Sequence, residues 1–441
     1  MWISKSRYNE LVEIDFTSAR FPREMVSEKL EKFSSQLDLL KSHSETRSSE
    51  PDSFLFLYSE EEIFNLASKL KENNDLERVK IVFLVGIGGA NLAFKALYDA
   101  LWGIGESRKE SKHFIFLDST DSLSETEADD IINSLSDASE ALILIVSKSG
   151  TTLETIGNAQ LVVGALEKKF GDVSGRIMAV TQKGSPLWQA LSETAADLFP
   201  TDAALSDRFS AFSTTALVPL SLLDFDIISY LKGAREMRDR CLLAESQNPA
   251  LVSATALHFH YGNSMRILDS FLFSPRLETL GKWYRQLGAE SLGKSETLDG
   301  NKTDIGFTPT VSIGTTDLHS MLQLYLAGPK NRFTQFVRSK DGDENHLIDT
   351  KSLGSLDDTL AGKSPAEILE AIFGSVKKSY EKEQLPFLEI TLETISENEL
   401  GAYMMFKMME TILLGELLNV NVYNQPNVEE YKKSARHSLG L

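Results

Sequence analysis

The sequence predicts an α/β protein built from doubly wound parallel sheets flanked by helices, with a helical arm at the C-terminus. The first observation is that short apolar runs alternate with longer amphipathic segments of helical period, an order typical of parallel sheets. The second is that this alternation comes in two cycles, separated by a helical stretch at 209–241. The third is size, since 441 residues, 42% of them hydrophobic, suffice for two or three domains with sizeable cores.

The first cycle follows a helical N-terminal segment, in which apolar residues between Glu24 and Leu40 recur at helical spacing. A polar loop is expected at 42–53. The expected strands of this cycle are 79–85, 113–117, 141–146 and 176–180. Its clearest helices are expected at 91–101 and 153–170.

The second cycle repeats the architecture without repeating the sequence. Its expected strands are 265–273, 311–314, 332–337 and 387–392, and its expected helices are 277–287 and 318–326. Residues 340–385 are charged and rich in Ser and Gly, and they predict no definite element. A long amphipathic helix at 398–418 and a basic helical tail close the chain. We therefore expect an N-terminal segment at 1–75, α/β domains at 76–205 and 206–395, and a C-terminal helix and arm at 396–441.

Charge and cysteine content narrow the partners and the compartment. The formal net charge is −19, which disfavours binding to nucleic acids and to anionic membranes. The single cysteine, Cys241, forms no internal disulfide and fits a reducing compartment. No apolar run approaches the ~20 residues of a membrane span, and the first ten residues hold no apolar signal core. We expect a cytoplasmic protein.

A glycine-rich turn at 86–89 follows the first strand and precedes a helix. Glycines at such a place let the backbone approach a ligand closely. A dinucleotide-binding turn would have a third glycine where Asn91 stands and an acid about 20 residues later, and Asp118 comes too late. A tight turn without a ligand is the plainer interpretation, and it stays open.

The loop Ser147 to Thr152 also lies between a strand and a helix, and it carries four hydroxyl side chains and Lys148. Hydroxyls and free N–H groups at a helix start suit the oxygens of a phosphate. The Walker pattern is absent, so a nucleotide P-loop is not indicated. The alternative is a helix capped by Thr151 or Thr152, which accounts for one hydroxyl only. The loop therefore favours a bound phosphate.

One acid, Glu290, lies between an apolar helical run and a Gly-Lys helix stop. Such an acid suits proton transfer next to a carbonyl, although a lone helix acid is usually a surface charge. Arg208, His319 and Lys432 also have ordinary structural interpretations when each is taken alone. His258 and His260 lack the companions of a metal site. The acid and the phosphate loop together suggest isomerisation of a phosphorylated sugar.

Taken jointly, these segments resemble the glucose-6-phosphate isomerase family. The most specific signals are Glu-Ser-x-Gly-Lys at 290–294 and Gln-Pro-x-Val-Glu-Glu-Tyr-Lys at 425–432. The matching pieces cover most of the span from 84 to 433, in the order 86–89, 147–155, 208–210, 274–278, 286–294, 314–328, 415–419 and 424–432. The resemblance implies two sugar-isomerase (SIS) domains, a homodimer with an active site shared between subunits, and no metal or cofactor.

The resemblance also implies roles for single residues. Glu290 would be the catalytic base, and Arg208 would stabilise the charge of the intermediate. His319 would open the sugar ring from the neighbouring subunit, and Lys432 would be the active-site lysine of the C-terminal arm. The implied contacts to the sugar phosphate come from the phosphate loop, the glycine turn and the arm, namely Ser147, Lys148, Ser149, Thr152, Gly89 and Gln425.

Three positions depart from the family pattern. Ala90 stands where a serine is common, and Asn427 replaces a glycine. Ser206-Asp207 stand where paired glycines are usual, so we expect the carboxylate of Asp207 to pair with Arg208 and to repel an anionic substrate.

Three other functions are weighed against the isomerase. One is a sugar-phosphate-binding SIS protein without catalysis, and another is a dual-specificity phosphoglucose/phosphomannose isomerase. The third is an NAD-dependent oxidoreductase.

Overall fold

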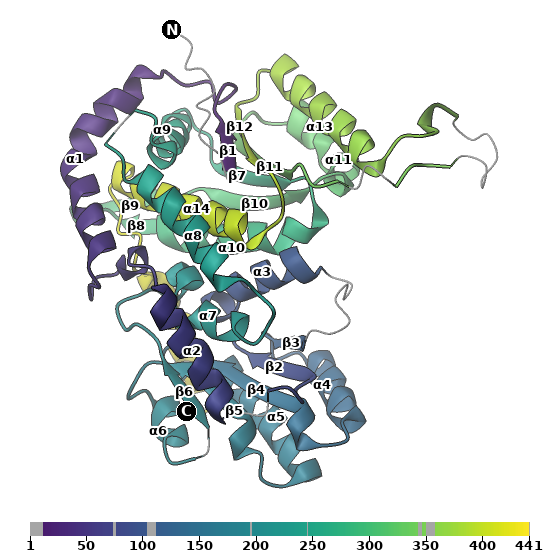
Figure 1. Cartoon of the computed structure of the whole chain (residues 1–441). Helices are drawn as coiled ribbons and strands as arrows, with labels where there is room; N and C mark the ends of the chain where they lie inside the picture. The colour runs from purple at the N-terminus through teal and green to yellow at the C-terminus, as the bar shows by residue number, and fades with distance from the viewer. Residues whose placement is uncertain are drawn as a thin grey trace.

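The computed structural model describes residues 12–73, 76–103, 112–194, 196–244, 246–342, 346–349 and 358–440. Two five-stranded sheets lie in separate lobes of the molecule (Figure 1). The sheet of the lower lobe in Figure 1 has the order β3-β2-β4-β5-β6, and all its neighbouring strands are parallel. Its strands are β2 (Ile81–Val85), β3 (His113–Leu117), β4 (Ala141–Val146), β5 (Ile177–Thr181) and β6 (Asp197–Pro200).

The second sheet has the order β1-β12-β11-β7-β10. Strand β1 pairs antiparallel with β12, and the other neighbours are parallel. The sequence analysis did not predict β1, which brings part of the N-terminal segment into this sheet. The remaining strands, including a separate β8-β9 hairpin, are β1 (Val12–Asp15), β7 (Ile267–Leu272), β8 (Lys294–Glu296), β9 (Lys302–Ile305), β10 (Thr308–Ile313), β11 (Arg332–Ser339) and β12 (Phe387–Leu392).

Strand β4 shows why apolar runs form the centre of these sheets. All six of its residues are buried. Alternate side chains enter two different core clusters, so both faces of the sheet are covered. The covering and connecting helices are α1 (Glu24–Glu45), α2 (Glu60–Asn73), α3 (Leu92–Trp102), α4 (Ser122–Ser134), α5 (Leu153–Phe170), α6 (Pro186–Leu191), α7 (Thr214–Leu220), α8 (Ile227–Cys241), α9 (Pro249–Gly262), α10 (Glu278–Leu292), α11 (Thr316–Ser320), α12 (Leu322–Ala327), α13 (Pro365–Lys382), α14 (Glu397–Leu417) and α15 (Glu429–Ser438).

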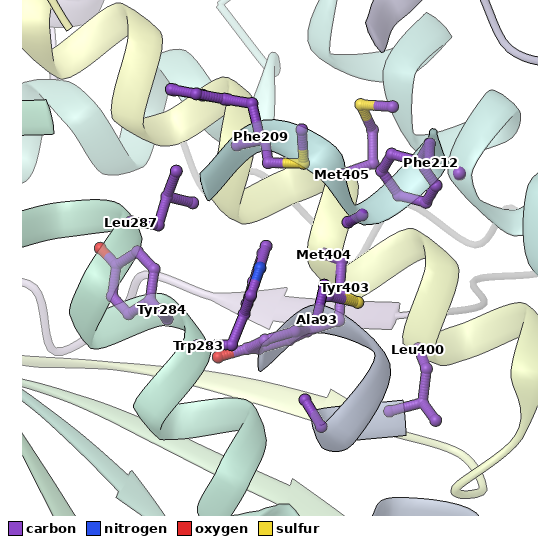
Figure 2. Packing of buried hydrophobic residues seen from close by; sticks show 14 of the residues in the cluster. Ala93, Phe209, Phe212, Trp283, Tyr284, Leu287, Leu400, Tyr403, Met404 and Met405 are labelled. Atoms are coloured by element: carbon purple, nitrogen blue, oxygen red, sulfur yellow. The ribbon is translucent and has the colours of Figure 1, made fainter. Parts of the chain in front are cut away.

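Helix α14 runs through the middle of the protein (Figure 1) and is buried without interruption from Glu399 to Gly415. A helix that is buried on every side is mostly apolar, and α14 is apolar apart from a few buried polar residues such as Lys407 and Glu410. Its methionines and aromatics pack against α8 and α10, and Figure 2 shows Tyr403 and Met404 together with Trp283 and Tyr284 of α10. The close approach of α8 requires glycine. A Cβ at Gly233 would lie 1.8 Å from the carbonyl oxygen of Asn398.

The predicted α/β fold is confirmed, and several elements have the predicted bounds: the strands 113–117, 141–146 and 387–392, and the helix 153–170. The helix expected at 318–326 is instead two short helices, α11 and α12. Helix α1 continues to Glu45, into the stretch where a loop was expected. Among the described residues, no helix is both long and apolar enough to cross a membrane.

Candidate active site

Arg208 is the centre of the candidate site. It lies in a short 3-10 helix, η5 (Asp207–Phe212), whose aromatic residues Phe209 and Phe212 are packed into the core near α14 (Figure 2). The side chain of Arg208 is 1% exposed. Its Nε donates to Ser291 Oγ at 2.8 Å, and one terminal nitrogen donates to Glu290 Oε2 at 3.1 Å. Burial lowers the pKa of Arg208, but a guanidinium stays charged in proteins, so the site holds a fixed positive charge.

Glu290 lies in the last turn of α10, which continues past the expected end at 287 to Leu292 and ends before Gly293 of the Gly-Lys helix stop. Its carboxylate is held from two sides, because Gln286 Nε2 donates to Oε1 at 2.8 Å and Arg208 donates to Oε2. The side chain is nevertheless 35% exposed. A carboxylate that is both oriented and open to solvent can exchange protons with a bound molecule.

Three residues around this pair received no role from the sequence. Gln286 orients Glu290, and Ser291 orients Arg208. Lys294 is 8% exposed and donates to the carbonyl oxygens of Glu290 and Asn424, both at 2.6 Å. Burial, aided by the charge of Arg208, lowers the pKa of Lys294 to about 8. The i,i+4 spacing of Gln286 and Glu290 on one helix was the signal that could have found the first of these contacts.

The C-terminal segment provides further hydrogen-bond acceptors for Arg208. Gln425 Oε1 accepts from Arg208 at 2.7 Å, and the carbonyl of Val422 accepts at 2.6 Å. Ser206, one of the residues that departs from the family pattern, donates to the carbonyl of Tyr423 at 2.7 Å. The serine therefore ties η5 to the arm instead of crowding the site.

The glycine turn lies where three parts of the site meet. A Cβ at Gly86 would lie 2.9 Å from the carbonyl of Val146, at the end of β4. A Cβ at Gly89 would lie 2.5 Å from the backbone of Asp207, and one at Gly88 would approach the side chain of Gln286. The missing side chains let the phosphate loop, η5 and α10 come together.

The loop Ser147 to Thr152 connects β4 to α5. Within it, the backbone N–H of Gly150 donates to Ser147 Oγ at 3.2 Å. Thr152 occupies the N-cap position, but its side chain makes no capping hydrogen bond. The capping alternative therefore does not account for this loop, and the first N–H groups of α5 donate no hydrogen bond to this side chain. Lys148 donates to the carbonyl of Leu205, just before η5, at 2.7 Å.

Asp207 does not form the expected ion pair with Arg208. All the hydrogen bonds of that guanidinium go to Glu290, Ser291, Gln425 and backbone carbonyls. Asp207 keeps contact with solvent, yet the surrounding protein desolvates its carboxylate and raises its pKa. Among the neighbouring charges that oppose this rise in the pKa of Asp207, that of Lys148 in the phosphate loop has the largest effect, ahead of Arg208.

The remaining predicted residues lie farther out. Lys432, on α15, pairs with Glu429 at 2.8 Å and contributes to the electrostatic field at Asp207. Helix α15 also reaches the phosphate loop, where Arg436 donates to the carbonyl of Thr151. His319, on α11, is exposed and forms no hydrogen bond with the other site residues that the structure describes.

The geometry thus brings together the phosphate loop, the Arg208–Glu290 pair and the C-terminal arm, and it leaves His319 outside. Residues 68–439 match the phosphoglucose isomerase family. The chain belongs to this family. The chain is 32% identical over 369 residues to the glucose-6-phosphate isomerase of Methanocaldococcus jannaschii, covering 83% of this chain and 85% of the relative.

A second relative is the probable glucose-6-phosphate isomerase of Methanococcus maripaludis, with 29% identity over 85% of this chain and 82% of the relative. A solved structure, the glucose-6-phosphate isomerase of Chlamydia trachomatis, superposes with a TM-score of 0.81 at 20% identity, covering 98% of this chain and 88% of that one. This structural likeness supports the fold of a phosphoglucose isomerase.

Proposed function

We propose that this protein is an aldose-ketose isomerase that interconverts glucose 6-phosphate and fructose 6-phosphate. Within a phosphoglucose isomerase chain, the observation that carries the proposal is the pairing of buried Arg208 with the solvent-accessible carboxylate of Glu290. One coupled assay with fructose 6-phosphate and mannose 6-phosphate tests it. Turnover of fructose 6-phosphate alone supports the proposal, turnover of both identifies a dual-specificity isomerase, and turnover of neither indicates a sugar-phosphate-binding protein.

In this proposal Glu290 moves a proton between C2 and C1 of the open-chain sugar. The carboxylate removes the C2 proton of the aldose and returns it to C1. The C2 hydroxyl loses its proton and becomes the ketone, and the C1 oxygen gains a proton and becomes the hydroxyl. The cis-enediol(ate) formed between these steps is negatively charged, and the fixed guanidinium of Arg208 stabilises it. We assign Gln425 and Gly89 to contacts with the sugar. We assign Lys432 to the part of the active site that the C-terminal arm forms. The reaction needs no cofactor.

The phosphate is assigned to the loop Ser147 to Thr152. Replacing Ser149 and Thr152 together by Ala is expected to raise KM at least about tenfold, because charge-assisted hydrogen bonds to the phosphate are lost, while kcat falls less. Steady-state kinetics measure both constants, and an unchanged KM in the double variant would contradict the assignment.

The exposed position of His319 supports a site completed by a second subunit. We assign ring opening to His319 of a neighbouring copy, since imidazole transfers protons near neutral pH. Mixing inactive Glu290→Gln protein with inactive His319→Ala protein is expected to restore activity, because a mixed dimer has one intact site. Subunit exchange is verified with differently tagged chains. If exchange occurs and no activity returns, both residues act within one chain.

Asp207 is expected to weaken substrate binding by competing for Lys148. Asp207→Asn keeps the shape and removes the charge, and KM should fall about fivefold, the equivalent of ~1 kcal/mol of repulsion. The effect should shrink at 1 M salt, where the screening length is ~3 Å. A lower kcat/KM with an intact fold would instead mean that the carboxylate positions a site residue.

The proposal includes a cytoplasmic location. The one cysteine, Cys241, is fully buried, and burial raises the pKa of its thiol to about 12. A chain with one inert thiol is compatible with a reducing compartment.

A further inference from the structure

A cavity lined by both apolar and polar side chains lies at the amino ends of β7 and β11. Its volume is ≈ 130 Å³, several times the ~30 Å³ that a water molecule occupies in the liquid. It opens on the face of the sheet covered by α12 and α13, where Tyr325 and Tyr380 belong to one core cluster. Helix α10, which carries Glu290, packs in the cluster on the other face. The sheet therefore separates this cavity from the candidate active site.

The cavity wall presents hydrogen-bond donors that have no acceptor. The Nε and one terminal nitrogen of Arg332 are buried without a hydrogen-bond partner, although the guanidinium also interacts with the side chain of Tyr325. The hydroxyl of Tyr380, a residue that is 1% exposed, is also buried without a well-aligned partner, although Thr334 lies beside it. The guanidinium of Arg332 stacks on the ring of Tyr325, with its Cζ 3.7 Å from the ring centroid. This contact holds the guanidinium in one orientation. Buried polar groups in folded proteins rarely lack a hydrogen-bond partner.

The charge of Arg332 also lacks a direct counterion. No ion pair of Arg332 is found among the described residues. The carboxylate of Asp269 acts on it from a distance, but its oxygens accept from the hydroxyls of Thr310 and Ser312. At the mouth, Lys330 adds a second positive charge, offset by Glu383 at 3.7 Å. Buried donor atoms without an acceptor are costly, and the two nitrogens of Arg332 face a space large enough for a ligand.

We propose that this cavity is a second, non-catalytic site for a small oxyanion. A tetrahedral phosphate or a small carboxylate would accept hydrogen bonds from Arg332 and from the hydroxyl of Tyr380. The entrance is open, because Leu324 is 48% exposed and Lys330 is exposed at its rim. The hydroxyl of Tyr325 is already bonded to Ser312 at 2.7 Å. The proposed donors come from β11 and α13, so an anion bound here links α13 to the sheet and stabilises the folded state.

The test separates this site from the phosphate loop. Full-length protein with Ser149→Ala and Thr152→Ala is titrated calorimetrically with inorganic phosphate, and in parallel with acetate. We expect one site per chain to survive in this background and to raise Tm. Adding Arg332→Met should weaken binding at least tenfold, whereas Arg266→Met, an exposed arginine next to β7, should change nothing. Binding of acetate but not phosphate would identify a carboxylate as the ligand class.

The proposal is overturned if neither anion binds in the loop-deficient background, or if Arg332→Met binds as well as its parent. Circular dichroism checks the fold of each variant. Should Arg332→Met fail to fold, Tyr380→Phe keeps the packing and removes one donor. A several-fold weaker affinity in that variant supports the site, and an unchanged affinity overturns it.

Discussion

Glu290→Gln is expected to lower kcat by roughly a hundredfold or more, the usual contribution of a general acid–base group, while KM changes only a few-fold. The amide has the size of the carboxylate, and its oxygen can still accept from Arg208. It cannot take up the proton that passes between C2 and C1. The loss therefore falls on the chemical step and spares binding of the phosphate.

Two measurements make this result specific. Steady-state assays in both directions give kcat and KM, and a competitive sugar-phosphate inhibitor reports binding independently. Glu296→Gln, an exposed acid six residues farther along the chain, is the matched control and should behave as wild type. A Glu290→Gln variant that keeps about a tenth of the wild-type rate would show that another group is the base.

The elements that the sequence predicted well are those whose burial is uniform. Strands β4 and β12 are buried at every position, and their ends are marked by apolar residues. Strand β1 has one fully buried residue, Val12, and it exists because β12 offers an edge far away in the chain. Such a strand is a tertiary effect, and local composition does not predict it.

The candidate site shows the same difference between local and long-range features. The roles of Glu290 and Arg208 were predicted because the residues around each of them form a recognisable local motif. The contacts that position them are long-range, since Arg208 meets Glu290 82 positions later and Gln425 217 positions later. Local patterns cannot place Ser206 against Tyr423 or Lys294 against Asn424. For the same reason the expected pairing of Asp207 with Arg208 was wrong.

A fully buried polar cluster supports the helix that carries Glu290. Lys407 and Glu410, both on α14 and both 0% exposed, form an ion pair. The carboxylate of Glu410 also accepts from Tyr284 on α10 at 2.6 Å and from Gln335 on β11 at 3.0 Å. Ser253 of α9 donates to it as well. The cluster joins three helices and the second sheet, and burial lowers the pKa of Lys407 to about 8.

Glu410→Leu is expected to be the most destabilising single change in this core, at about 3–5 kcal/mol. It leaves the buried ammonium of Lys407 without its carboxylate, and the hydroxyls of Tyr284 and Ser253 without an acceptor. Chemical denaturation measures the loss. The control is Glu278→Leu, which removes an ion pair with Lys282 whose side chains are 39% and 42% exposed and should cost about 1 kcal/mol or less.

The double variant Lys407→Met/Glu410→Leu decides whether the cost arises from the stranded charge. Removing both partners eliminates the unpaired ammonium, and apolar replacements of a buried pair are often neutral. The double variant should therefore be more stable than Glu410→Leu alone, despite carrying one more substitution. If it is less stable, the loss in Glu410→Leu comes from packing and from the acceptorless hydroxyls, and the ion pair contributes little to holding α10 in place.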